Sequence, residues 1–193
     1  MSKIKCIGII AEDKSDFETA KILIKRILNK DNLTFKKAVG NGCGKLRRKA
    51  LDYAIDLRKR GCDMLILIHD LDRNTHRTLY EELTKKIEDA PINNKFVCIP
   101  IEEIEAWFLS DPESIKSTFR LARKPKFHGR PETISSPKET LAEQIYLCSN
   151  KSTIFLNTRH NQKLAEQISL ALLIEKCESF LNLHSFVTQF EYR

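Results

Sequence analysis

Four acidic residues have the type and spacing of a divalent-metal site. Glu12 follows an apolar run, and Asp16 comes four residues later, near the expected start of a helix. Asp70 and Asp72 directly follow a second apolar run as a D-x-D pair. Residues two apart on an extended chain point to the same side, and residues four apart on a helix share a face. We therefore expect the four carboxylates to converge.

Converging carboxylates repel each other, and one pair at ~4 Å costs several kcal/mol at moderate dielectric. A hard divalent cation removes this repulsion, and oxygen ligands favour Mg²⁺ or Mn²⁺. The alternative is that each aspartate only caps a helix or stabilises a turn. Acids after two separate apolar runs favour the metal site over this alternative.

A third acidic group follows the next apolar run, which ends at Pro100. Of its members, Glu105 is the candidate to complete a two-metal site. The alternative is that these acids only complement the dipole of a helix that starts here. Trp107, the sole tryptophan, is expected in the core, with base stacking as the alternative.

These acids need a scaffold of alternating strands and helices. Runs rich in apolar and β-branched residues predict strands over 3–11, 33–39, 62–69 and 95–100. Helical spacing of apolar residues predicts helices over 16–28, 45–60, 75–89 and 102–109, the first begun by a capping box from Ser15 to Glu18. This order predicts an α/β fold with a parallel sheet flanked by helices. Sites in such folds gather where strands end and helices begin.

The second part of the chain has a different character. Prolines interrupt residues 112–152, where basic residues outnumber acidic ones, which predicts a loop-rich basic insertion. A short strand is expected over 152–156, a helix over 161–173 and shorter helices over 177–190. We therefore divide the chain into a core, 1–111, and an insertion with a helical C-terminal extension, 112–193, packed on that core.

The chain of 193 residues carries 33 Lys and Arg against 26 Asp and Glu, a formal charge of +7. A basic balance favours a polyanionic partner such as DNA or RNA, although it also simply aids solubility. Lys45 follows a glycine-rich loop and is expected to neutralise transition-state charge. Leu46 stands where a Walker motif needs Ser or Thr, which disfavours an ATP site. The expected nucleic-acid contacts, with a solvated basic surface as the alternative, are Arg47, Arg48, Arg123, Lys124, Lys126, Arg130 and Arg159.

The six cysteines are scattered, without the paired spacing of a metal finger. Buried reduced thiols in a cytoplasmic protein fit this pattern best. The first residues form no signal region, and no apolar run approaches the ~20 residues that span a membrane. We expect a soluble cytoplasmic protein without a membrane partner, and association of its copies stays open.

The acidic motifs resemble those of a known family. Residues Glu12-Asp-Lys-Ser-Asp16 resemble the E-G-x-x-D signature of Toprim domains, and His69-Asp-Leu-Asp72 resembles their D-x-D motif. Toprim domains occur in topoisomerases, bacterial primases and nucleases of the overcoming-lysogenization-defect type. Glu102-Glu-Ile-Glu105-Ala-Trp107 resembles Toprim-like bacterial proteins, some of them associated with phage defence. One difference is Asp13, which replaces the glycine of the first motif.

The resemblance implies a Toprim-like catalytic core over 1–111. Glu12 would be a ligand or general acid/base, Asp70 and Asp72 would hold Mg²⁺, and Asp16 would support a second metal. With the basic segments, this predicts a Mg²⁺-dependent nuclease for DNA or RNA, with a role in phage defence. One alternative is a regulatory, nucleic-acid-binding subunit of a defence complex with an ATPase partner. Another is a metal-dependent phosphatase or phosphotransferase.

Overall fold

Four parallel strands form the sheet of the protein in a computed structural model that describes residues 3–40 and 42–193. The spatial order is β2-β1-β3-β4, with β1 and β3 in the middle and β2 and β4 at the edges. Ile7 of β1 pairs with Phe35 of β2 and with Met64 of β3. The strands are β1 (Cys6–Ala11), β2 (Thr34–Val39), β3 (Met64–Ile68) and β4 (Asn94–Cys98).

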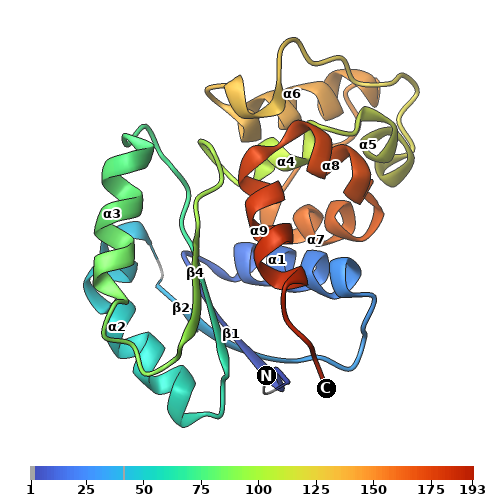
Figure 1. The fold of residues 1–193 in the computed structure, drawn as a ribbon. Helices are drawn as coiled ribbons and strands as arrows, with labels where there is room; N and C mark the ends of the chain where they lie inside the picture. The colour runs from blue at the N-terminus through green and yellow to red at the C-terminus, as the bar shows by residue number, and fades with distance from the viewer. Residues whose placement is uncertain (1–2, 41) are drawn as a thin grey trace.

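Helices cover both faces of this sheet (Figure 1). One face packs against α1 (Lys14–Leu28) and α9 (Glu178–Thr188), and the other packs against α2 (Cys43–Lys59) and α3 (His76–Lys86). β1 and β3 are buried along their whole length because apolar side chains leave them toward both faces. The predicted α/β class with a parallel sheet is confirmed.

The remaining helices pack beside α1 and extend its side of the molecule (Figure 1). One buried apolar cluster runs from β1 and β3 into these helices. Arg26 of α1 also donates to the carbonyl oxygens of Ala165 and Ile168, each at 2.7 Å. These elements are α4 (Glu105–Phe108), α5 (Pro112–Phe119), a 3₁₀ turn (Pro131–Thr133), α6 (Pro137–Cys148), α7 (Asn157–Gln167) and α8 (Leu170–Lys176).

The structure differs from the expected elements in the second half of the chain. Pro112 and Pro137 begin helices instead of interrupting them, because proline suits the first helical turn. Residues 152–156 form no strand. The helix expected over 161–173 is divided, because Ser169 caps α8 and donates its N–H to Asp111 Oδ2 at 2.9 Å. Residues 120–136 remain mostly irregular.

The first helix also begins earlier than expected. Asp13, not Ser15, is the N-cap, and its Oδ1 accepts the N–H of Asp16 at 3.0 Å. Asp16 returns the contact by accepting the Asp13 N–H at 3.3 Å, so the capping box joins these two acids. Ser15 instead donates its hydroxyl to the Asn157 carbonyl oxygen at 3.1 Å. Both residues of this capping box, Asp13 and Asp16, line the acidic cavity described below.

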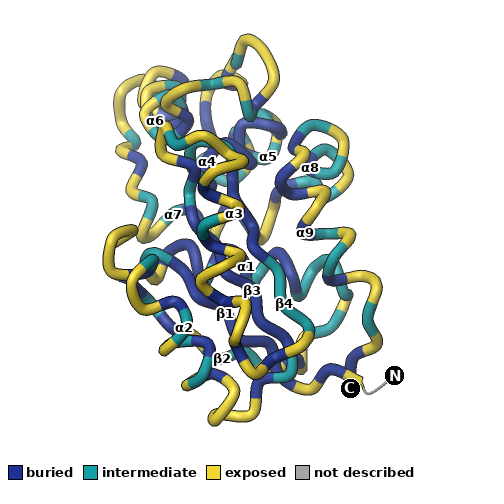
Figure 2. The backbone as a smooth tube through the Cα atoms, turned by 60° about the vertical axis from the view of Figure 1, so that its left-hand side comes forward, coloured by how far each residue is buried: buried dark blue, intermediate teal, exposed yellow. Residues whose placement is uncertain are grey.

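Trp107 lies in the core, as expected, and is fully buried. Its indole N–H donates to Ser179 Oγ at 2.8 Å, and its ring meets Phe180 edge-on. The tube in Figure 2 shows the same concentration of buried residues along the strands and the inner helices. Among the described residues, no helix is long and apolar enough to cross a membrane.

Two isoleucines offer a matched test of this core. Ile66 lies in the central strand β3 at 0% exposure, whereas Ile154 is 71% exposed. Ile66→Ala should lower the free energy of unfolding by about 2–5 kcal/mol, because it removes buried methyl groups and leaves a cavity. Ile154→Ala should change it by less than about 0.5 kcal/mol. Urea unfolding followed by circular dichroism measures both, and equal losses would contradict this placement of the core.

Candidate metal centre

All the predicted acids except Asp72 line one cavity at the carboxyl edge of the sheet. Its volume is about 420 Å³. Glu12 follows β1, Asp70 follows β3, and Glu105 begins α4 a few residues after β4. Because these strands are parallel neighbours, their carboxyl ends meet at the same edge. The cavity is lined by Glu12, Asp13, Asp16, Gly42, Asp70, Glu103, Glu105, Lys138 and Asn157.

Glu12 lies beside a buried histidine, His69, that donates no hydrogen bond to its Oε1. Arg47 Nε donates to His69 Nε2 at 3.0 Å, which leaves the proton of the neutral ring on Nδ1. That Nδ1 lies 2.6 Å from the Asp70 carbonyl oxygen and 3.1 Å from Glu12 Oε1. The N–H points at the carbonyl, so Glu12 Oε1 is buried without a hydrogen-bond partner among the described residues. Such an oxygen is available to a cation.

Burial makes the charged form of Glu12 costly. It raises the pKa of Glu12 from 4.5 to about 7, and the negative charge of Asp72 adds to the effect. Burial likewise lowers the pKa of His69, which keeps the ring neutral. Glu12 can therefore exchange a proton near neutral pH, as a general acid or base must.

Burial and neighbouring negative charges also raise the pKa values of Asp70 and Asp16. Asp70 Oδ1 accepts the N–H of Ile104 at 3.1 Å. Burial raises the pKa of Asp70 well above its ordinary range, followed by repulsion from Asp16 and Glu105. Burial also raises the pKa of Asp16 from 3.8 to about 8, with the Asp13 charge as the next cause. Each carboxylate therefore opposes the ionisation of its neighbours.

Glu105 lines the cavity from the loop after the third strand. It is 3% exposed, and its Oε1 accepts from Asn161 Nδ2 at 2.9 Å. Burial raises the pKa of Glu105. Asn161 is fully buried, and its side-chain oxygen has no partner among the described residues. Asn161 thus fixes the orientation of one predicted ligand, a role that no sequence motif signalled.

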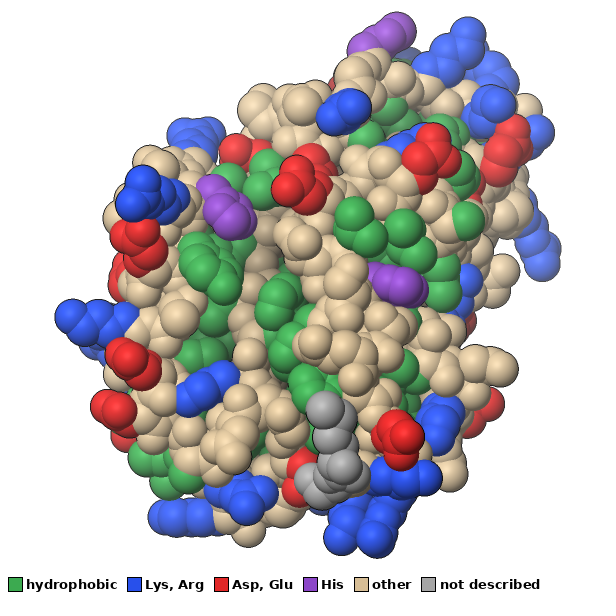
Figure 3. Space-filling view, in the orientation of Figure 1, with side chains coloured by type: hydrophobic (Ala, Val, Ile, Leu, Met, Phe, Trp, Pro, Cys, Tyr) green, Lys and Arg blue, Asp and Glu red, His purple; other side chains and the backbone are tan. Residues whose placement is uncertain are grey.

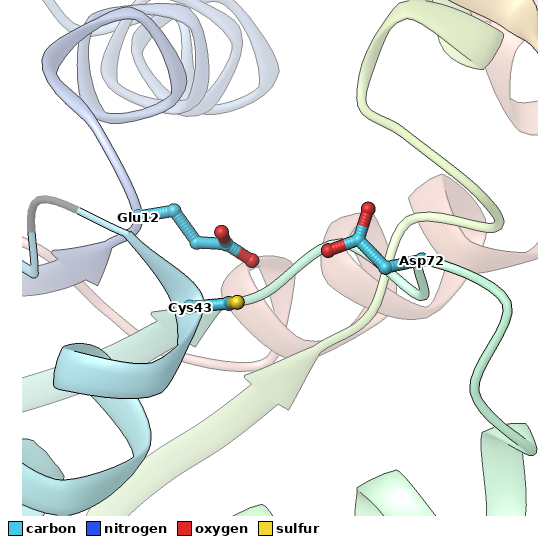
Figure 4. A group of neighbouring side chains, drawn as sticks. All are labelled: Glu12, Cys43 and Asp72. Carbon is cyan, nitrogen blue, oxygen red and sulfur yellow. The ribbon is translucent and has the colours of Figure 1, made fainter.

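Asp72 lies at the rim of the site instead of beside Asp70. Its φ of 48° is left-handed, so the extended-chain argument for a shared side fails at this residue. Asp72 is exposed and approaches Glu12 and Cys43, with one ligand atom of each of the three within 4.8 Å of the others. Figure 4 shows these three side chains pointing toward one another from β1, α2 and the loop after β3. Cys43 was not predicted as a site residue.

The backbone is strained where β3 and β4 end. Asp72, Arg73 and Glu102 all have positive φ, between 48° and 61°. The Asp72 N–H donates to the Glu102 carbonyl oxygen at 3.2 Å, which extends the pairing of the two strands beyond their ends. Strained non-glycine residues persist where the surrounding structure holds them, and they concentrate at functional sites.

The predicted basic residues do not border this cavity. Lys45 and Arg48 are exposed on α2, and Arg47 contacts His69 and, at 3.5 Å, Glu82. In the described chain, the cation that lines the cavity is Lys138, in the first turn of α6. The backbone N–H of Lys138 donates to Glu103 Oε2 at 3.1 Å. No sequence motif signalled this contact, because it depends on how α6 packs.

The other basic residues expected to contact nucleic acid have different local surroundings. Arg123 donates to the Leu147 carbonyl oxygen, and Lys124 pairs with Glu113 at 2.9 Å. Lys126 is exposed, and Arg130 borders a different cavity, of about 620 Å³. Arg159 is exposed on α7, two residues after Asn157 of the acidic cavity. Of the predicted contacts beyond α2, Arg159 is thus the one closest in sequence to a residue that lines the acidic cavity.

The raised pKa values predict how the stability of the metal-free protein depends on pH. The folded state retains protons that the unfolded state releases above its ordinary carboxyl pKa values of 3.8 and 4.5. This stabilisation is complete below those values and is lost as the pH rises through about 7 and 8. The free energy of unfolding, measured in EDTA, should therefore fall between pH 5 and pH 8.

Asp70→Asn should make that fall smaller, because a neutral amide removes one charge and its repulsion of Asp16 and Glu12. Asp89→Asn, at an exposed position after α3, is the matched control and should leave the pH dependence unchanged. Urea titrations across this range provide the measurement. Equal pH slopes in the wild type and Asp70→Asn would contradict the assignment.

Comparison with known proteins places the chain in a family. Searches of curated proteins and of solved structures found no match to it. One family model, described as "Domain of unknown function (DUF4276)", matches residues 11–188. The match includes every acid of the cavity and the helices packed around it. The chain therefore belongs to the DUF4276 family.

Proposed function

We propose that this protein is a Mg²⁺- or Mn²⁺-dependent nuclease that cleaves phosphodiester bonds of DNA or RNA in the cytoplasm. The observation that carries the proposal is the set of crowded carboxylates around one cavity, with Glu12 Oε1 buried and unpartnered. The Toprim-like order of the motifs supports it. The resemblance to proteins associated with phage defence extends the proposal to the restriction of phage nucleic acid.

The donor set fits a hard divalent cation. Glu12, Asp16, Asp70 and Glu105 would hold it, since carboxylate oxygens are the ligands that Mg²⁺ and Mn²⁺ prefer. Burial and mutual repulsion raise the pKa of each of these groups, and a bound cation offsets both effects. Asp72 would contribute from the rim, next to Glu12.

Other residues of the chain suit a phosphodiester substrate. When bound, the divalent ion supplies Lewis acidity and lowers the pKa of water. Glu12 would act at the cavity wall as a charged ligand, because a bound cation lowers the pKa that burial raises to about 7 in its absence. Lys138 brings a positive charge to the same wall. Gly42 precedes α2 and has no side-chain cap, so the first amides of this helix remain available to a phosphate.

Cleavage assays test the proposal. We expect the purified protein to cut supercoiled plasmid, single-stranded DNA or RNA with Mn²⁺ or Mg²⁺ and to be inactive in EDTA. Asp70→Asn and Glu12→Gln should each reduce the rate by about 100-fold or more, because each removes a ligand or proton-transfer group. The controls Asp89→Asn and Glu166→Gln change exposed acids outside the cavity and should retain the wild-type rate.

Two results would contradict the proposal. One is the absence of cleavage with every substrate and both metals. The other is cleavage that Asp70→Asn and Glu12→Gln leave at the wild-type rate, which would identify a contaminating nuclease. Faster turnover of a simple phosphomonoester than of any polynucleotide would instead assign the site to a phosphatase.

A further inference from the structure

β4 has an open edge whose backbone groups lack partners. It pairs with β3 on one side and is the last strand of the sheet. His69 and Leu71 donate to the carbonyl oxygens of Cys98 and Pro100, so the even-numbered residues of this strand face β3. N–H and C=O groups of alternate residues point to opposite edges. The odd-numbered residues Val97 and Ile99 therefore direct their backbone N–H and C=O groups away from β3.

Little of these two residues is exposed. Val97 is 5% exposed and Ile99 is 3% exposed. Within residues 3–40 and 42–193, their outward N–H and C=O groups form no hydrogen bond. Unpaired backbone groups at the edge of a sheet can pair with another chain. The edge is thus suited to an extended backbone that supplies the missing partners.

The space beside the edge has room for such a segment. A hollow of about 380 Å³ is lined by residues 96–99 together with residues of α3 and α9. Tyr80 comes from α3 and Asn182 from α9. A second hollow of about 450 Å³ shares Tyr80, Phe96 and Val97 but has a charged lining, so the uncharged hollow between α3 and α9 is the one considered for the segment. The charged residues of the second hollow are Glu81, Lys85, Glu88 and Lys95. Figure 2 places β4 between the two helices, and Figure 3 shows hydrophobic atoms between them on this face.

We infer that an uncharged, extended segment of a partner protein binds here and adds a fifth strand beside β4. In a chain with 31% charged residues, the hollow between α3 and α9 is lined by no Lys, Arg, Asp or Glu. That lining matches an uncharged segment and offers nothing to a polyanion. Backbone hydrogen bonds would supply affinity, and alternate side chains would meet Tyr80 and Asn182.

A second copy of the chain fits this edge less well. The opposite edge strand, β2, carries Lys36 and Lys37, and edge lysines disfavour pairing with another strand. The lysine of β4, Lys95, instead donates to the carbonyl oxygens of Ile87 and Ala90. In a dimer that paired β4 with β4, the α3 and α9 helices of both copies would meet around the two strands, because these helices flank β4 in each copy. A single strand avoids this crowding. The inference does not depend on the metal site or on nuclease activity.

The test uses a library of random decapeptides as the probe. Peptides selected on the full-length protein are titrated by fluorescence anisotropy, and amide hydrogen exchange maps where they bind. We expect selected peptides to slow exchange at Val97 and Ile99. Val97→Pro removes an outward N–H and leaves the hydrogen bonds to β3 in place, as edge strands permit. Asn182→Trp fills the hollow.

Both variants should weaken binding at least tenfold, while the matched control Asn32→Trp, an exposed residue just before β2, should not. Circular dichroism checks that each variant is folded, and Asn182→Trp keeps the test decisive if Val97→Pro unfolds. The inference is overturned if no peptide protects these amides or if Asn182→Trp binds as the wild type does. Protection of the same amides in a dimer of this chain, without peptide, would also overturn it.

Discussion

The repulsion among buried carboxylates at one edge of the sheet is the constraint that orders the rest of the structure. A parallel sheet brings the ends of β1, β3 and β4 together, and each end delivers acids to the same cavity. Burial and repulsion raise the pKa of Glu12, Asp16 and Asp70. Such a cluster weakens a fold unless protons or cations offset its charge. In the proposed function, a divalent cation supplies that compensation.

The elements outside the sheet hold this unfavourable cluster in place. His69 is fixed between Arg47 and the Asp70 carbonyl, and Asn161 holds Glu105 from α7. The extension brings Lys138 to the cavity and shares one apolar core with the sheet. The second part of the chain is therefore part of the site's framework, although the acids come from the first part.

The sequence predicted what depends on local pattern. Continuous apolar runs identified the four strands, and the parallel order followed from their alternation with helices. Glu12 and Asp70 were proposed because they follow apolar runs that form strands, and Glu105 because it belongs to the acidic group after the next such run. Asp72 was misplaced because a left-handed backbone breaks the extended-chain rule. Tertiary packing leaves no periodic signal in the sequence. The positions of the basic residues, and the contacts that Cys43, Lys138 and Asn161 make at the site, were therefore not predicted.

The open edge of β4 is a separate feature, and the metal site remains the central claim. Crystals of the protein soaked in Mn²⁺, with anomalous diffraction recorded, test it most directly. The account predicts an anomalous peak within ~2.5 Å of oxygens from Glu12 and Asp70, and the absence of that peak in Asp70→Asn crystals. Ordered crystals with no peak in this cavity, or with Mn²⁺ bound only elsewhere, would contradict it.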